Sequence, residues 1–166
     1  GIDLGFGGPT DLDGLGQAPA LDCGYHEVLD NRIEGNGAGG ICGCVAPAVR
    51  IAGNVIRGNE TLGTGADESA GIKLHYCFDA RIEGNLIIGN DCPGIWLDNT
   101  WCGARITRNV IIDNAGAGIF IEMGEGPLLI ENNVVAYTRA TMSLAGDGIY
   151  AHDSSGVTVA HNLVWF

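Results

Sequence analysis

Short hydrophobic runs, rich in β-branched residues, alternate along the chain with glycine and asparagine. Gly-Ile pairs recur at 40–41, 71–72, 94–95, 118–119 and 148–149. Six asparagines share a second pattern, with an aliphatic residue three positions before and another two positions after: Asn31, Asn54, Asn85, Asn109, Asn133 and Asn162. Brief runs separated by such turn residues predict strands rather than helices.

The spacing of the repeat predicts the fold. Successive asparagines lie 23, 31, 24, 24 and 29 residues apart, so a base period of about 23–24 is interrupted by two insertions, at 60–70 and 137–146. A period of this length with two or three strands per turn is typical of a parallel β-helix, in which each coil stacks on the last. We therefore predict an all-β, right-handed parallel β-helix that forms a single domain over residues 1–166.

Stacking gives each repeated position a column. The aliphatic positions should form the core. Each repeated asparagine should sit at a turn, where Asn tolerates left-handed backbone, and can hydrogen-bond its copy in the next coil. The chain begins in mid-pattern with "GIDLG", ends in the apolar "HNLVWF" and shows no obvious cap over its terminal strands. We expect a fragment of a larger protein, with further domains or a homo-oligomer as partners.

Alternation along the Gly-Ile strands separates inward from outward positions. The Ile of each pair and the residue two positions later should point inward. One outward column then contains Cys42, Lys73, Trp96, Phe120 and Tyr150, and a second contains Cys44, His75, Asp98, Glu122 and His152. Both columns should lie on one exposed sheet face.

Asp98 and Glu122 occupy the same point of consecutive repeats, so neighbouring strands about 4.7–4.9 Å apart should stack them directly. Like charges opposite each other destabilise a sheet, which makes this a poor way to solubilise a face. Retaining glycosidases hold two carboxyls about 5–5.5 Å apart. We expect one acid to keep its proton and act as donor beside a nucleophile, with the aromatic column offering sugar rings a flat surface. A solvating face and a calcium site are the alternatives.

Composition restricts the chemical class of ligand that the chain is expected to bind. The net charge of -12 disfavours nucleic acid and polyanionic saccharides, so a neutral ligand fits better. No apolar run reaches the roughly 18 residues of a membrane span. The six cysteines form no CxxC pair and the four histidines complete no zinc pattern, so no metal site is predicted. The cysteines read chiefly as small buried hydrophobes, with disulfides as the alternative.

The motifs "AGIKLH", "GIWLD" and "GPLLIENN", in this order and spacing, resemble glycoside hydrolase family 120, the β-xylosidases built on a parallel β-helix. The likeness covers most of the chain but only the helical core of such an enzyme, because family members are longer and carry an additional β-sandwich domain. It implies an Asp nucleophile at Asp98 and a Glu acid/base at Glu122. It further implies that Glu68 and His75 help to form the sugar pocket.

Two departures from the family pattern flank that pocket. Asn99 stands where the family usually has an aromatic residue, and Gly124 and Glu125 stand where it usually has an Asn-His pair. The chemistry could survive these changes while the sugar specificity differs.

The resulting hypothesis is a retaining glycoside hydrolase that cleaves a neutral sugar, a β-xyloside or xylo-oligosaccharide, without a cofactor. His75 would hydrogen-bond a hydroxyl, Trp96 or Trp101 would wall the pocket, and the two insertions would complete it. Phe120 and His152 join the substrate-binding set from their columns. Lys73 either stabilises the nucleophile or simply pairs with an acid. The alternatives are a polysaccharide lyase or epimerase, and a non-catalytic carbohydrate-binding or structural solenoid.

Overall fold

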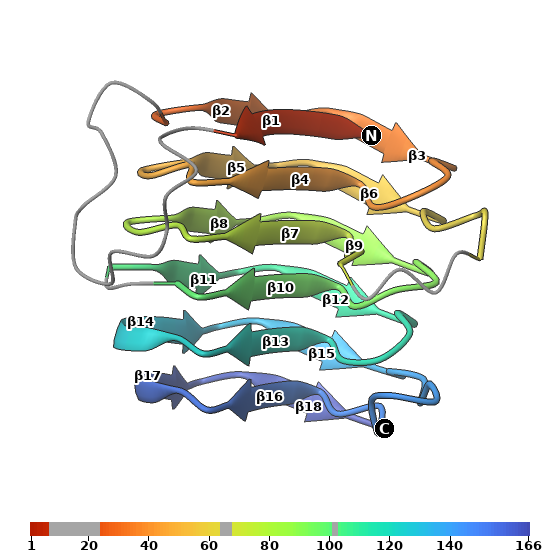
Figure 1. Ribbon diagram of the computed structural model, residues 1–166. Helices are drawn as coiled ribbons and strands as arrows, with labels where there is room; N and C mark the ends of the chain where they lie inside the picture. The colour runs from red at the N-terminus through yellow and green to blue at the C-terminus, as the bar shows by residue number, and fades with distance from the viewer. Residues whose placement is uncertain (7–23, 64–67, 101–102) are drawn as a thin grey trace.

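The protein is a stack of coils, each built from three short strands (Figure 1). A computed structural model describes residues 1–6, 24–63, 68–100 and 103–166. Within these ranges the strands form three parallel sheets of six strands each, and the two chain ends lie in the first and last coils. The predicted all-β, right-handed parallel β-helix is confirmed.

Each coil contributes one strand to each sheet. Sheet A comprises β1 (Ile2–Phe6), β4 (Ile41–Cys44), β7 (Ile72–His75), β10 (Ile95–Asp98), β13 (Ile119–Glu122) and β16 (Ile149–His152). Sheet B comprises β2 (Glu27–Leu29), β5 (Arg50–Ala52), β8 (Arg81–Glu83), β11 (Arg105–Thr107), β14 (Glu125–Glu131) and β17 (Ser155–Ala160). Sheet C comprises β3 (Arg32–Glu34), β6 (Val55–Arg57), β9 (Leu86–Ile88), β12 (Val110–Ile112), β15 (Val134–Ala136) and β18 (Leu163–Trp165).

Equivalent residues of neighbouring coils pair in register, as the repeat predicts. In sheet A the Ile of each Gly-Ile pair is opposite its copy in the next coil, and Ile72, Ile95 and Ile119 have no exposed surface. The aliphatic residues three positions before and two positions after the repeated asparagines line up in the same way in sheets B and C. Fully buried side chains from all three sheets therefore form one continuous core.

A residue with left-handed backbone ends almost every strand and turns the chain into the next sheet. After sheet A the φ angles are 52° at Val45, 50° at Tyr76, 47° at Asn99, 48° at Met123 and 45° at Asp153. The corners after sheets B and C use the same conformation, several of them at glycine, as at Gly84 (φ 63°) and Gly89 (φ 64°). The repeated asparagines do not use their tolerance of this backbone, because the left-handed residue is the one immediately before each of them.

The asparagines form the predicted ladder of side-chain hydrogen bonds. Asn109 Nδ2 donates to Asn133 Oδ1 (3.0 Å) and to the carbonyl of Ile82 (3.0 Å). Its own Oδ1 accepts from the backbone N–H of Asn85 (3.0 Å) and from Asn85 Nδ2 (2.9 Å). A second ladder, which the sequence analysis did not identify, follows the corners after sheet C: Asn36, Asn59, Asn90 and Asn114. Buried amides thus satisfy backbone groups at two of the three corners.

The cysteines that the structure describes are free thiols. Cys44, Cys77 and Cys92 are buried, as expected of small hydrophobes, and burial raises the pKa of Cys77 to about 12. Cys23 and Cys102 lie outside the described residues. The described part of the chain includes no helix that is long and apolar enough to cross a membrane.

Candidate active site

The two outward columns of sheet A pair in register, but their middle is not exposed. Asp98 is opposite His75 on one side and Glu122 on the other. Asp98, Lys73 and Trp96 are only 5%, 4% and 8% exposed. The expectation of an open sheet face is therefore wrong for this segment. Large side chains of successive coils stack on one another there and exclude solvent.

Asp98 is held by a buried lysine. Lys73 Nζ lies 2.9 Å from Asp98 Oδ2 and 3.0 Å from Glu68 Oε2, so the ammonium group bridges the two carboxylates. The Lys73 and Asp98 side chains are nearly inaccessible, whereas that of Glu68 is 70% exposed. A buried charge needs a close partner of opposite charge, and Lys73 and Asp98 are such partners for each other.

Asn99 clamps the other oxygen of Asp98. Its Nδ2 donates to Asp98 Oδ1 at 3.0 Å and lies 3.3 Å from His75 Nε2. Burial lowers the pKa of His75 and outweighs the opposing effect of Asp98, whose Oδ2 is 3.5 Å from Nε2. A neutral imidazole accepts the Asn99 amide hydrogen at Nε2 and keeps its own proton on Nδ1. Asn99 occupies a left-handed corner, a conformation in which Asn is several-fold enriched.

Glu122 has different neighbours. The indole N–H of Trp96 donates to Glu122 Oε2 at 3.1 Å, and His152 Nδ1 lies 4.0 Å from Glu122 Oε1. The other ring nitrogen of His152 lies 3.7 Å from Asp153 Oδ2. The Glu122 side chain is 23% exposed, so it remains open to solvent where Asp98 does not.

The aromatic column is a stack in which neighbouring rings cover one another's faces. The Trp96 and Phe120 centroids are 5.1 Å apart with planes 26° from parallel, and the Phe120 and Tyr150 centroids are 5.1 Å apart at 14°. Lys73 Nζ lies 3.0 Å from the Trp96 ring centroid, on a cation–π contact. A ligand beside this stack would meet ring edges, not the flat surface expected from the sequence.

A groove of about 550 Å³ runs beside the stack, within the usual size of ligand sites. Trp96, Phe120, Tyr150, Glu122 and His152 line it from sheet A. The second insertion contributes Thr141, Met142, Ser143 and Leu144, and the first contributes Glu60 and Ser69. The described parts of both insertions therefore wall the site, as expected.

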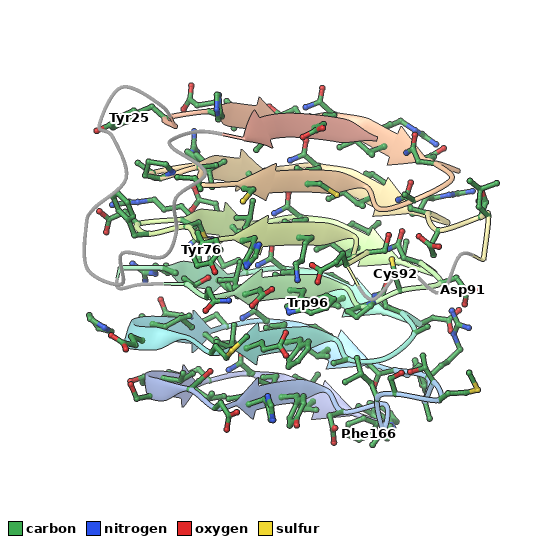
Figure 2. The ribbon with its side chains drawn as sticks, in the orientation of Figure 1. Tyr25, Tyr76, Asp91, Cys92, Trp96 and Phe166 are labelled. Carbon is green, nitrogen blue, oxygen red and sulfur yellow. The ribbon has the colours of Figure 1, made fainter. Side chains whose placement is uncertain are left out.

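Cys92 and Asp91 lie beyond the amino ends of the sheet A strands and Tyr76 lies at their carboxyl ends (Figure 2).

The structure brings most of the expected site residues together. Glu68, Lys73, His75 and Asp98 form one cluster, and Trp96, Phe120, Glu122 and His152 line the groove beside it. Trp101 lies outside the described residues. The sequence marked Asn99 only as a departure from the family pattern, and Glu60 and Ser69 were not singled out within the first insertion. Only the column position of Asn99, directly after Asp98 at a corner, carried a usable signal.

Metal ligands are a separate matter. Among the residues that the structure describes, no group of three or more His, Cys, Asp or Glu side chains could hold a metal ion.

Comparison with known proteins agrees with this architecture. The family described as "Right handed beta helix region" matches residues 18–164. Among solved structures, the chain is similar to XylC in its complex with xylose, with 25% identity and a TM-score of 0.69 over 84% of this chain. The match spans only 22% of the XylC chain. No curated protein sequence matches significantly. Because the family match extends over most of its length, this chain belongs to the right-handed β-helix family.

Proposed function

We propose that the chain carries the catalytic groups of a retaining glycoside hydrolase that acts on a β-xyloside or a related neutral xylo-oligosaccharide. One observation carries the proposal. Asp98 and Glu122 are paired in register on β10 and β13, yet each has its own set of partners. Asp98 is ion-paired with Lys73, whereas Glu122 meets an indole N–H and a histidine. Two adjacent acids in unlike surroundings can divide the roles of nucleophile and proton donor.

In the first step, a carboxylate oxygen of Asp98 bonds to the anomeric carbon as the bond from that carbon to the leaving oxygen breaks. Glu122 donates its carboxyl proton to the leaving oxygen. In the second step, the Glu122 carboxylate takes a proton from water, whose oxygen bonds to the anomeric carbon and releases Asp98. Two inversions at that carbon retain its configuration. The reaction needs no cofactor.

The surrounding residues take supporting roles. Lys73 and the Asn99 amide fix the orientation of the Asp98 carboxyl group, because both donate hydrogen bonds to its oxygens. The Nδ1–H of neutral His75 would donate to a sugar hydroxyl. Glu68, which is exposed beside Lys73, would accept from another.

Three further observations support the substrate class. A similar solved structure is XylC with xylose, and the motifs around Asp98 and Glu122 resemble glycoside hydrolase family 120. A net charge of -12 favours a neutral sugar over a uronate. A lyase or epimerase would need a cation against the substrate carboxylate, but Lys73 already bridges two acids.

A non-catalytic binding solenoid is the second candidate, favoured by the deep burial of Asp98. In that case the Lys73–Asp98 pair would be structural and the groove would bind a saccharide without cleaving it.

Azide rescue separates the two candidates. An aryl β-xyloside is offered to the wild type, to Asp98→Ala and to Glu122→Ala, with Glu34→Ala on sheet C as control. We expect both active-site variants to lose turnover. Azide should restore it with an α-xylosyl azide product for Asp98→Ala and a β-xylosyl azide product for Glu122→Ala. Unchanged hydrolysis by Asp98→Ala, or binding of the xyloside by the wild type without turnover, would contradict the proposed hydrolase function.

A further inference from the structure

Asn99 bridges the proposed nucleophile and the nearest histidine. Its Nδ2 lies 3.0 Å from Asp98 Oδ1 and 3.3 Å from His75 Nε2, so a single amide group contacts both side chains. It directly follows β10, at a left-handed corner (φ 47°). One amide therefore relates the hydrogen bonding of the carboxyl group to that of the imidazole.

Asp98 fixes which way the Asn99 amide faces. The carboxylate offers only acceptors, so the atom of Asn99 beside Oδ1 is the NH2 nitrogen and not the carbonyl oxygen. An NH2 group has two hydrogens, and with one on Asp98 the other is directed to His75 Nε2. Nε2 must then present a lone pair, which places the proton of a neutral imidazole on Nδ1.

A second group competes for the same ring nitrogen. Asp98 Oδ2 lies 3.5 Å from His75 Nε2, and the opposite tautomer would direct its Nε2–H there. Oδ2 already accepts from Lys73 Nζ at 2.9 Å, whereas the Asn99 amide is nearer to Nε2 and already oriented. Stacking on Tyr76, with ring centroids 4.1 Å apart, holds the plane of the imidazole. The Asn99 contact therefore prevails, and Nδ1 has no hydrogen-bond partner among the residues that the structure describes.

The ring has one proton to place only while it is neutral. Burial is the largest effect on the pKa of His75 and lowers it, and the charged groups that follow in order of effect are Asp98, Lys73, Glu68 and Glu122. The three acids raise this pKa and Lys73 lowers it further. Cys44 is opposite His75 on β4, and burial raises the pKa of its thiol, so it adds no charge. The net effect lowers the pKa of His75 from 6.5, so the imidazole is neutral above that pH.

We propose that Asn99 is a positioning residue that fixes His75 in the Nδ1–H tautomer, so that the imidazole presents an N–H donor to the ligand and not a lone pair. The His75 side chain is 31% exposed, and the neighbouring Glu68 carboxylate, 70% exposed, can only accept. The cluster thereby offers one donor and one acceptor, which suits a neutral ligand that bears hydroxyls. The identity of this ligand as a sugar rests on the proposed hydrolase, whereas the tautomer does not.

Long-range proton–nitrogen correlation NMR of the whole chain above pH 6.5 measures the tautomer directly. The ring signals of His75 are identified by their loss in His75→Gln. Asn99→Asp replaces the NH2 group with an oxygen and keeps a residue that tolerates left-handed backbone, and Asn99→Gly removes the side chain. Asn132→Asp, at an exposed left-handed corner (φ 54°) after sheet B, is the matched control.

We expect the wild type and Asn132→Asp to have a protonated Nδ1 and an unprotonated Nε2. In Asn99→Asp the proton should move to Nε2, which then donates to the new carboxylate, and the pKa of His75 should rise by about one unit or more. Asn99→Gly should lose the preference for Nδ1–H. An Nε2–H tautomer in the wild type overturns the proposal, as does a tautomer that both Asn99 variants leave unchanged. The wild-type spectrum tests the tautomer even if neither variant folds.

Addition of xylose separates the tautomer from the hydrolase. If the Nδ1–H of His75 donates to the sugar, xylose should shift the Nδ1 signal of the wild type and leave Nε2 unprotonated. The same addition should not produce this shift in Asn99→Asp. An Nδ1 signal that does not respond to xylose contradicts the donor role. Absence of xyloside turnover by the wild type contradicts the hydrolase and leaves the tautomer assignment intact.

Discussion

Trp96 joins the two halves of the candidate site. Its indole N–H donates to Glu122 Oε2 at 3.1 Å, while the ammonium of Lys73 lies 3.0 Å from its ring centroid. The same ammonium is 2.9 Å from Asp98 Oδ2. One buried ring therefore links the cation that holds the proposed nucleophile to the proposed proton donor.

Trp96→Phe should impair proton donation while leaving the aromatic stack in place. The variant loses the hydrogen bond to Glu122, for which a loss of about tenfold to a hundredfold in kcat is expected, and it also shortens the ring beneath Lys73. The reaction should also become more sensitive to the acidity of the leaving phenol across a series of aryl xylosides, because poor leaving groups depend most on the donor. Trp165→Phe, in the exposed last coil, is the matched control. An equal loss for every phenol would assign Trp96 a structural role only.

Lys73→Met should strongly destabilise the fold. It leaves the Asp98 carboxylate buried without its ion-pair partner, and breaking a buried pair on one side costs about 3–5 kcal/mol. Urea denaturation measures the free energy of unfolding. The double variant Lys73→Met/Asp98→Leu should recover most of the loss, because neither member of the buried pair then carries a charge. A single-variant loss below about 1 kcal/mol, typical of exposed pairs, would contradict the burial of this pair.

Because His75 is buried, we predict that the free energy of unfolding decreases as the pH is lowered. Its pKa in the folded protein is lowered from 6.5, so below that value the unfolded chain binds a proton that the folded chain refuses. This contribution to the free energy of unfolding is complete above pH 6.5 and is lost as the pH falls toward the lowered pKa. Denaturation curves on both sides of pH 6.5 should show a smaller pH dependence in His75→Gln. His161→Gln, at an exposed corner, should behave as the wild type does.

Asn109→Ala should break the first asparagine ladder at its centre. The substitution removes the acceptor of the Asn85 backbone N–H and the donor to the Ile82 carbonyl, both buried. Unsatisfied buried groups cost about 1–3 kcal/mol each, so the free energy of unfolding should fall by about 3 kcal/mol or more. Asn31→Ala, at the exposed end of the same ladder, should cost far less. Equal losses at the two positions would show that the ladder is not stabilised by its burial.

Periodicity predicted which residues of neighbouring strands are paired in the site, but not how deeply they are buried. Because side chains alternate along a strand, the spacing of "GIWLD" and "GIFIE" was enough to place Asp98 opposite Glu122. Alternation says nothing about what covers an outward column. The burial of Asp98 results from the stacking of Lys73 on Trp96, a contact between side chains of different coils.

Two other features had weak or absent signals in the sequence. The Asn99 amide reaches Asp98 because the corner is left-handed, and a departure from a family pattern does not reveal that geometry. Glu60 and Ser69 meet across an insertion whose length breaks the repeat, so no column relates them. The structure of the repeated part of the chain could therefore be predicted from the sequence, and that of the irregular part that lines the groove could not.

The one-coil offset between Asp98 and Glu122 makes the spacing of the two acids a discrete variable. Strands of a parallel stack lie about 4.7–4.9 Å apart, so the backbone positions that carry two acids of one column are one step apart or two, with none between. One step is close to the carboxyl separation of retaining enzymes, and two steps, near 9.5 Å, reach the upper end of the inverting range, where a water molecule fits. In such a scaffold a switch of stereochemical outcome would require the transfer of an acid from one repeat to the next, not a gradual widening of the site.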